Sequence, residues 1–171
     1  KKAEPHKSSE FKEEFILKLK NDLKILKEIQ QMWEEVKRDP KIDKLIKTLQ
    51  STDLLKKNKI ILFTESKETA EYLGANLPKK LASETIVFSG GSSSSTRDKV
   101  IENFDAKAKK PKNEYRILIT TDVLSQGVNL HQSNVVMNYD IPWNPTRMMQ
   151  RVGRVNRVDT KFNKLYTFNF F

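Results

Sequence analysis

Three arginines recur at every third position near the C-terminal end of the sequence. Arg151, Arg154 and Arg157 lie in the segment QRVGRVNR (150–157), with Gly153 between the first two. On a helix or a tight turn this spacing directs the guanidinium groups to one side, and the glycine lets another backbone approach closely. A guanidinium is always charged, and its planar fork matches the oxygens of a phosphate. The segment therefore favours phosphate chemistry, whereas the alternative is a solvated helix face with surface ion pairs.

The sequence lacks the elements that hold a nucleoside triphosphate without help. No segment fits G-x-x-x-x-G-K-[ST], because the glycine-rich segment GGSSSST (90–96) has no Lys-Ser/Thr ending. There is also no Asp-Glu pair of the kind that holds Mg²⁺ beside ATP. The arginines therefore have no phosphate loop to act with in this chain, and the chain by itself is expected to show negligible ATPase activity.

Five short apolar runs are typical of strands that are buried on both faces of a sheet. They cover residues 59–63, 84–88, 116–120, 134–139 and 164–170, and helical patterns over 64–77, 96–104 and 146–155 lie between them. This alternation indicates an α/β fold with right-handed crossovers and a parallel sheet that helices cover on both sides. Ligands of such sheets bind where the carboxyl ends of strands meet helix N-termini. The segments to inspect for chemistry are therefore TES, SGG, TTDVLSQGVN and DIPWNP.

The first third of the sequence has a different pattern. Apolar residues recur at spacings of three or four between Phe11 and Val36, which predicts a long helix with Ser9 as its cap and a break at Pro40. A second helix follows, with an apolar face made by Ile42, Leu45, Ile46 and Leu49. Because regular heptads are few, we favour packing of this stripe against its own domain over a coiled-coil seam.

These patterns divide the chain into three parts. Residues 1–8 are expected to form a disordered lead-in, residues 9–57 a helical segment, and residues 58–171 the sheet domain. The lysine-rich segment 106–113 is expected to be a surface loop.

Composition narrows the choice of partners and compartments. The net charge of +10 favours an anionic partner, although many lysines also solvate surfaces, and 37% apolar residues are enough for a core. Without cysteine there are no disulfides or thiolate metal sites, and His6 and His131 are too far apart in sequence to suggest a metal site. No apolar run approaches the ~20 residues of a membrane span, and the first ten residues lack a signal-peptide core. We expect a soluble, cytoplasmic protein.

The order of the segments resembles conserved motifs IV, V and VI of superfamily 2 helicases. The resemblance covers residues 59–170 and rests on ILFTES, FSGG with Arg97 downstream, ILITTDVLSQGVNL, NYDIPWNP and QRVGRVNR. It implies a RecA-like C-terminal motor lobe with a P-loop NTPase-like fold. The Gln-Arg opening of QRVGRVNR and its NYDIPWNP lead-in resemble Swi/Snf-type and HepA-like DNA translocases. DEAD-box RNA helicases usually open that motif with His-Arg.

The resemblance assigns roles around the nucleotide. Arg154 and Arg157 match the arginine fingers on the γ-phosphate of ATP, where a guanidinium from a second lobe stabilises the charge that spreads over the phosphoryl oxygens. Gln150 and Arg151 match positions that couple the nucleotide site to the opposite lobe.

The resemblance also places the end of motif V next to the nucleotide. Gly127 and Asn129 match this end, and many relatives have aspartate, which binds the ribose hydroxyls, where this chain has Asn129. The Swi/Snf-like branch commonly has asparagine at that position.

A second group of residues matches contacts to the nucleic-acid backbone. Thr121 follows the third predicted strand, and its hydroxyl can donate to phosphate or cap the next helix. Thr64, Gly90 and Arg97 are similar candidates, although Arg97 can equally form a salt bridge on a helix surface. Trp143 can stack on a base, but we favour packing because it lies between two residues suited to a rigid turn.

The resemblance implies the C-terminal lobe of an ATP-driven DNA translocase or helicase. We expect ATP with Mg²⁺ as cofactor, with the Mg²⁺ ligands on a separate N-terminal lobe, and double-stranded DNA as partner. We expect a monomer that is associated with a bacterial nucleoid. An RNA helicase lobe and a catalytically inert nucleic-acid-binding module are the alternatives. A flavodoxin-like enzyme leaves the arginine triplet unexplained.

Overall fold

The computed structural model describes residues 6–7, 10–125, 128–156 and 162–170, except for the side chain of residue 125. The chain divides into two compact units, Lys1–Pro40 and Lys41–Phe171. The second unit includes two helices that the sequence pattern grouped with the N-terminal segment.

The first unit contains the long helix α1 (Glu13–Glu34). Lys12 occupies its N-cap without a side-chain hydrogen bond, and the predicted cap, Ser9, lies outside the described residues. The helix ends before Pro40 and exposes many large apolar side chains, including Phe15, Leu19, Leu26 and Trp33. For α1, packing against the sheet domain stays a prediction.

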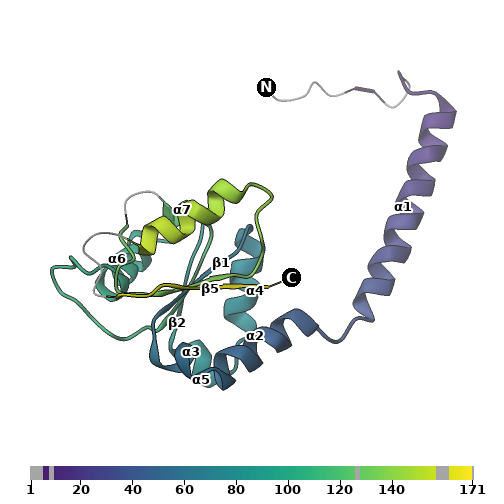
Figure 1. The fold of residues 1–171 in the computed structure, drawn as a ribbon. Helices are drawn as coiled ribbons and strands as arrows, with labels where there is room; N and C mark the ends of the chain where they lie inside the picture. The colour runs from purple at the N-terminus through teal and green to yellow at the C-terminus, as the bar shows by residue number, and fades with distance from the viewer. Residues whose placement is uncertain (1–5, 8–9, 126–127, 157–161, 171) are drawn as a thin grey trace. The chain divides into compact units, whose positions relative to one another are not determined.

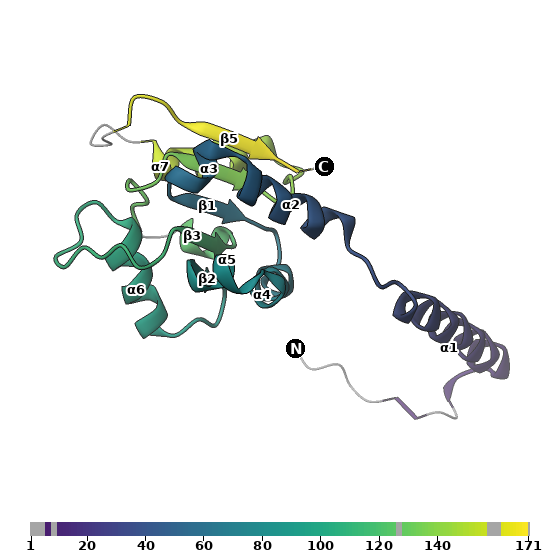
Figure 2. The same cartoon turned by 90° about the horizontal axis from the view of Figure 1, so that it is seen from below.

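The second unit is built on a five-stranded parallel sheet, which confirms the predicted α/β class. The strands are β1 (Ile60–Phe63), β2 (Thr85–Phe88), β3 (Ile117–Thr120), β4 (Val135–Asn138) and β5 (Tyr166–Asn169). Their order is β2-β3-β1-β4-β5, so the first strand in sequence lies at the centre (Figure 2). Each one forms within a predicted apolar run. All neighbouring strands pair in parallel, so their carboxyl ends share one edge of the sheet.

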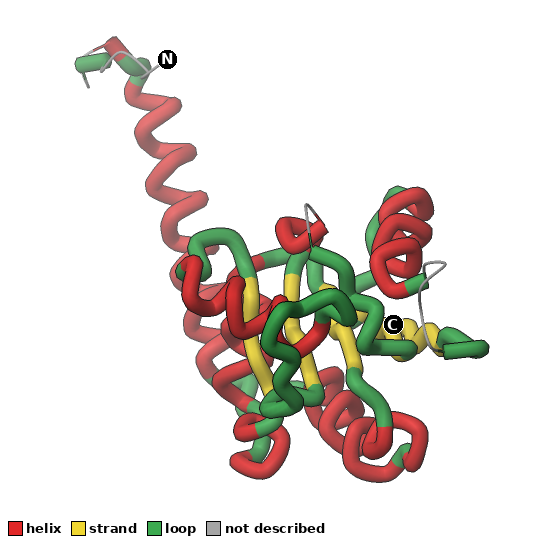
Figure 3. The backbone as a smooth tube through the Cα atoms, turned by 90° about the vertical axis from the view of Figure 1, so that its left-hand side faces the viewer, coloured by secondary structure: helices red, strands yellow, loops and turns green. Residues whose placement is uncertain are grey.

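Helices cover both faces of the sheet, and each face has its own apolar core (Figure 1). Because side chains alternate along a strand, β1 contributes Ile60 and Leu62 to one core and Ile61 and Phe63 to the other. The first core is completed by α2 (Pro40–Ser51), α3 (Asp53–Lys57), α4 (Lys67–Asn76) and α5 (Lys79–Ser83). The second is completed by α6 (Ser94–Phe104) and α7 (Pro145–Val155). Helices lie on either side of the strands in Figure 3.

The two helices that precede β1 are part of the first core. Ile42, Leu45 and Leu49 of α2 are buried there together with Leu55 of α3. The predicted packing of this stripe against its own domain is confirmed for α2. Pro40 is the first residue of α2, a position where the missing backbone donor costs no helical hydrogen bond.

Polar side chains set where the helices begin. Ser66, Ser93 and Asn144 occupy the N-caps of α4, α6 and α7, and each accepts a hydrogen bond from a backbone N–H in the first turn. In the serine segment, Ser93 is the cap, and Ser94 and Ser95 already belong to α6. The single helix predicted over 64–77 starts later and ends at Asn76. Pro78 then caps the separate helix α5.

Gly74 brings α4 close to β2. A Cβ atom at this position would lie 2.5 Å from Cγ2 of Val87, which is too close for any side chain. The first core therefore requires glycine at this point of the helix.

Within the described part of the chain, no helix is both long and apolar enough to cross a membrane. The same residues contain no group of three or more His, Asp or Glu side chains that could hold a metal ion.

Candidate functional site

The carboxyl ends of three strands meet the helix that carries the arginines. Thr64 and Glu65 follow β1, Thr121 and Asp122 follow β3, and Asp140 follows β4. A short 3-10 helix, η2 (Asp122–Ser125), begins at the end of β3 and contacts α7. Five acceptor atoms from four residues at these strand ends converge on one side chain of α7, that of Arg151.

Arg151 is a buried hub that uses all five of its N–H donors. Its Nε and Nη2 donate to the two carboxylate oxygens of Asp122, at 2.8 and 3.0 Å. Its Nη1 donates to Oδ1 of Asn138 at 3.1 Å and to the carbonyl oxygen of Asp140 at 3.2 Å. A second bond from Nη2 reaches Oε1 of Glu65 at 2.5 Å. Because a guanidinium has only five donors, Arg151 has none left for a ligand.

Burial makes this hub important for stability. The Arg151 side chain is only 1% exposed, and its guanidinium lies 5.2 Å from the ring centroid of Phe63. A charge in such a place is tolerated only when it is paired and fully hydrogen-bonded. Arg151 therefore fixes the ends of β1, β3 and β4 relative to one another.

A second arginine extends the ion-pair network to the surface. Arg147 lies one helical turn before Arg151 on α7, and its Nη1 donates to Oε2 of Glu65 at 3.0 Å. The same nitrogen lies 3.9 Å from Oδ2 of Asp122. The Arg147 side chain is about half exposed, so this pair is weaker than the buried one.

Asp140 ties the end of β4 to the start of the sheet unit. Its carboxylate accepts hydrogen bonds from the Thr64 hydroxyl, the Glu65 backbone N–H and the Lys41 ammonium group, at 2.5, 3.3 and 3.2 Å. Burial by itself would raise the pKa of Asp140, but the hydrogen bonds from Thr64 and Lys41 outweigh it and hold that pKa below its ordinary value. Asp140 is therefore held as a carboxylate.

A groove of about 310 Å³ lies beside this network. We call it the strand-end groove, and it is lined by Glu65, Lys67, Gly90, Thr121, Asp122, Val123, Arg147 and Gln150. Gly91 has a φ of +99°, a conformation that favours glycine, and it turns the chain directly after Gly90. Gly90, Thr121 and Gln150, which were predicted as site residues from three separate motifs, therefore line one groove.

The wall of the groove contains an unusual hydroxyl. The Thr121 residue is only 5% exposed, and its Oγ1 atom is buried without a hydrogen-bond partner among the described residues. Buried polar atoms are normally paired, so this hydroxyl is an exception at a residue that lines the groove.

Thr64 is placed differently from Thr121. It is fully buried, and its hydroxyl is already donated to Asp140. The structure therefore gives Thr64 an internal partner, and its side chain does not line the groove.

The remaining candidates lie apart from the groove. Arg154 is in the last turn of α7 and half-buried, and its backbone oxygen accepts a hydrogen bond from the N–H of Leu130 at 3.2 Å. Asn129 is also half-buried, whereas Arg97 is exposed on α6. Gly127 and Arg157 lie outside the described residues, so their roles stay predictions.

The prediction that Trp143 has a packing role is wrong within the sheet unit. Its side chain is 104% exposed, because the turn that joins β4 to α7 directs it away from both cores. Pro142 is buried in that turn instead.

Sequence reasoning missed the partners of Arg151. It identified the loops after the strands as segments to inspect, but not the acidic residues Glu65, Asp122 and Asp140 within them. Their positions in the sequence could have revealed them. Each acidic residue follows a buried strand within a few residues, so all three can face the helix that carries the arginines.

Comparison with protein families decides the class of the chain. Residues 40–159 match the family described as "Helicase conserved C-terminal domain", which is well over half of the sequence. The chain belongs to this family. Its parallel sheet with flanking helices is the RecA-like fold of a helicase C-terminal lobe, as the sequence predicted.

Relatives of this helicase C-terminal domain come from more than one branch. An uncharacterized ATP-dependent helicase of Bacillus subtilis, YqhH, is 38% identical over 114 residues, which cover 66% of the chain and 19% of that protein. The structure of the C-terminal part of the Fun30 ATPase domain superposes with a TM-score of 0.61 at 22% identity, over 77% of the chain and 41% of that structure. Dbp5 of S. cerevisiae, bound to RNA and ADP BeF3, gives 0.60 at 26% identity, over 77% of the chain and 32% of Dbp5.

The chain spans about a fifth of the length of the Bacillus relative. The Fun30 likeness, at 22% identity, shows a shared fold.

Proposed function

We propose that this helicase C-terminal domain is the second motor lobe of an ATP-driven DNA translocase. In this proposal Arg154 and Arg157 complete an ATP site whose other half lies on an N-terminal lobe. The strand-end groove grips the backbone of double-stranded DNA.

The observation that carries the proposal is the contrast between two arginines of α7. Arg151 is saturated by five internal hydrogen bonds, whereas the Arg154 side chain makes no hydrogen bond or ion pair with any described residue. Helix α7 thus contains one arginine that holds the domain together and another whose guanidinium is available for a ligand. An arginine that acts on a phosphate in trans needs its donors free in the separate lobe.

The chemistry of the chain fits half of an ATP site. When bound, ATP with Mg²⁺ supplies the phosphoanhydride whose hydrolysis drives the motor. Arg154 would place a positive charge beside the phosphoryl oxygens, while Arg151 would keep α7 fixed to the strand ends. Asn129 and Gln150 are the further residues proposed to face the nucleotide or the opposite lobe, together with Gly127 and Arg157.

The groove supports contact with a phosphate backbone. Lys67, Gly90 and Thr121 line the groove together, and the Thr121 hydroxyl has no hydrogen-bond partner among the described residues. Hydroxyls, glycine-rich backbone and cations position a nucleic acid without reading its sequence. Arg97 is a candidate for a further phosphate contact. Thr64 would support binding of the nucleic-acid backbone only indirectly, through its hydrogen bond to Asp140.

Two features favour DNA over RNA. The Gln150–Arg151 opening and the NYDIPWNP lead-in resemble the Swi/Snf-type and HepA-like translocases. Trp143, which lies in that lead-in, is fully exposed, and a contact between it and a nucleic acid fits DNA and RNA equally. The second candidate is an RNA helicase lobe, because several relatives are named ATP-dependent RNA helicases.

The test compares nucleic acids as activators of the full-length protein. We expect duplex DNA to stimulate its ATPase activity strongly, and single-stranded DNA and RNA to stimulate it less. Stimulation by RNA alone would instead assign the domain to the RNA helicase class. The chain by itself, assayed beside it, is expected to show no ATPase activity above background.

A further inference from the structure

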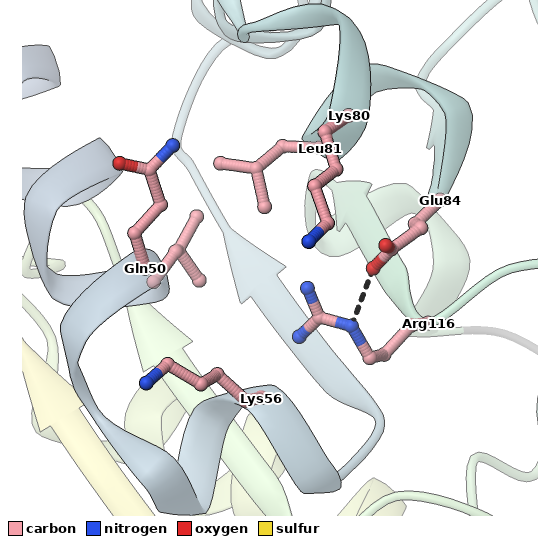
Figure 4. Close-up of a pocket in the computed structure, with 7 residues that line it drawn as sticks. Gln50, Lys56, Lys80, Leu81, Glu84 and Arg116 are labelled. Carbon is pink, nitrogen blue, oxygen red and sulfur yellow. Dashed lines mark hydrogen bonds and ion pairs between the residues drawn. The ribbon is translucent and has the colours of Figure 1, made fainter.

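A second pocket lies at the opposite end of the sheet from the strand-end groove. It has a volume of about 360 Å³ and is lined by Leu49, Gln50, Lys56, Lys80, Leu81, Glu84 and Arg116 (Figure 4). We call it the amino-end pocket, because Glu84 and Arg116 directly precede β2 and β3. The groove residues Gly90 and Thr121 follow the same two strands. Since the strands are parallel, the pocket and the groove lie at opposite edges of the sheet.

The amino-end pocket has an excess of positive charge. Three of its side chains are cations, Lys56, Lys80 and Arg116, and one is an anion, Glu84. Nε of Arg116 donates to Glu84 at 2.7 Å and its Nη1 donates to the backbone oxygen of Leu55, so these contacts fix the guanidinium in place. Nη2 of Arg116 has no partner among the described residues.

The two lysines differ in how they are paired. Lys56 forms an exposed ion pair with Asp53 at 3.0 Å. Lys80 forms no hydrogen bond or ion pair with a described residue, and Figure 4 shows its ammonium group directed toward the guanidinium of Arg116. Two like charges that face each other across a hollow favour an anion between them.

The inner wall of the pocket is apolar. Leu49 and Leu81 are buried in the first core and still line the pocket. Figure 4 shows the Leu81 side chain and the amide of Gln50 facing the same hollow as Lys80. A ligand that fits this surface combines an anionic group with an apolar group at a short distance from it.

We propose that the amino-end pocket binds an acidic peptide segment of a partner protein. A carboxylate of the peptide is held between Lys80 and Nη2 of Arg116, and a neighbouring apolar side chain packs on Leu49 and Leu81. A nucleic-acid backbone fits less well, because it has no apolar side chain to pack on Leu49 and Leu81. A partner at this edge of the sheet leaves the strand-end groove free, so the domain can bind the partner and a nucleic acid at the same time.

The test measures peptide binding to the chain at low salt. The probe is a fluorescein-labelled acetyl-Leu-Glu-Leu-Glu-Leu-amide, and its matched control has glutamine in place of both glutamates. We expect the glutamate peptide to bind at least tenfold more tightly, because a charge-assisted hydrogen bond is lost in the control. Its affinity is expected to fall as NaCl is added.

Variants of adjacent lysines locate the site. Lys80→Gln is expected to weaken binding of the glutamate peptide about tenfold, which corresponds to the loss of one charged contact. Lys79→Gln, on the same helix but outside the pocket lining, is the matched control and should leave binding unchanged. Lys80 is exposed, so thermal unfolding of both variants should match that of the unmodified chain.

Three results would overturn the proposal. The first is equal binding of the glutamate and glutamine peptides, and the second is equal loss of binding in the Lys79→Gln and Lys80→Gln variants. The third is binding of inorganic phosphate or duplex DNA at this pocket with no binding of the peptide. Because Lys80 lies away from the groove, failure here leaves the proposed motor function untouched.

Discussion

An arginine lies at each end of the parallel sheet, Arg151 fully buried and Arg116 partly buried, and the two have different surroundings. At the carboxyl end, Arg151 has acceptors from Glu65, Asp122, Asn138 and Asp140 and uses all five donors. At the amino end, Arg116 has a single carboxylate partner and keeps Nη2 without a described partner. The number of nearby acceptors, and not the residue type, decides whether an arginine is internal structure or a binding group.

The same difference appears within helix α7. Arg151 points into the domain, where the carboxylates that follow the strands meet it. Arg154 lies three residues later, with no described partner. We therefore expect substitutions of Arg151 to affect folding first, and substitutions of Arg154 to affect function without affecting folding.

The largest effect is expected from Arg151→Ala. Removing this guanidinium leaves Asp122 and Glu65 without their buried partner, and breaking such a network costs about 3–5 kcal/mol of unfolding free energy. Urea unfolding of the chain measures this value. Arg154→Ala is the matched control and should change the unfolding free energy by less than ~0.5 kcal/mol. Similar losses for the two variants would remove the distinction between them.

A smaller effect is expected from Asp140→Asn. The carboxylate accepts hydrogen bonds from Thr64, Lys41 and the backbone of Glu65, so we expect a cost of about 1–2 kcal/mol at neutral pH. The folded-state pKa of Asp140 is lowered, so its contribution is complete above the pKa of the unfolded state, about 4. It is lost as pH falls through the folded-state pKa.

Acid unfolding curves check the sign of this prediction. Stability of the unmodified chain should fall more steeply below about pH 4 than stability of Asp140→Asn. Equal slopes of stability against pH below about pH 4 for the two proteins would show that Asp140 does not titrate as described.

The smallest effect on folding, with the opposite sign, is expected from Thr121→Val. The Thr121 hydroxyl has no described partner, so replacing it with a methyl group of similar shape should be neutral or stabilise the fold by up to about 1 kcal/mol. The same change should weaken binding of duplex DNA several-fold, because the groove loses a donor to phosphate. Thermal unfolding and fluorescence anisotropy separate the two effects. Destabilisation together with unchanged DNA binding would make Thr121 a structural cap.

Much of the fold could be predicted from the sequence, because all five apolar runs became strands. Continuous burial on both faces leaves a strong local signal in runs such as IILF and VVMN. The packing partner of α2 leaves no such signal, since its apolar face has the same period whether it packs on this sheet or elsewhere. The structure shows that Ile42, Leu45 and Leu49 belong to the sheet core.

The candidate site could be predicted only in part. The spacing of QRVGRVNR indicated a functional arginine cluster, but it could not show that Arg151 points inward. That depends on Glu65, Asp122 and Asp140, which are separated from it in sequence and meet it only when the strands align. The packing prediction for Trp143 was wrong for a related reason. The flanking residues predict a rigid turn, but they do not show whether the tryptophan side chain faces the core or solvent. The amino-end pocket left no motif at all, since it gathers residues from α2, α3, α5 and two loops.

The most direct test of the central claim is the ATPase activity of the full-length protein with Arg154→Ala, measured at saturating duplex DNA. Arg154→Lys serves as the variant that keeps the charge but loses the planar fork. We expect the alanine variant to lose about 10³-fold in turnover, with unchanged thermal unfolding and DNA binding, and the lysine variant to recover only part of the activity. Activity within a few-fold of the unmodified protein would contradict the proposal that Arg154 acts on the phosphate of ATP.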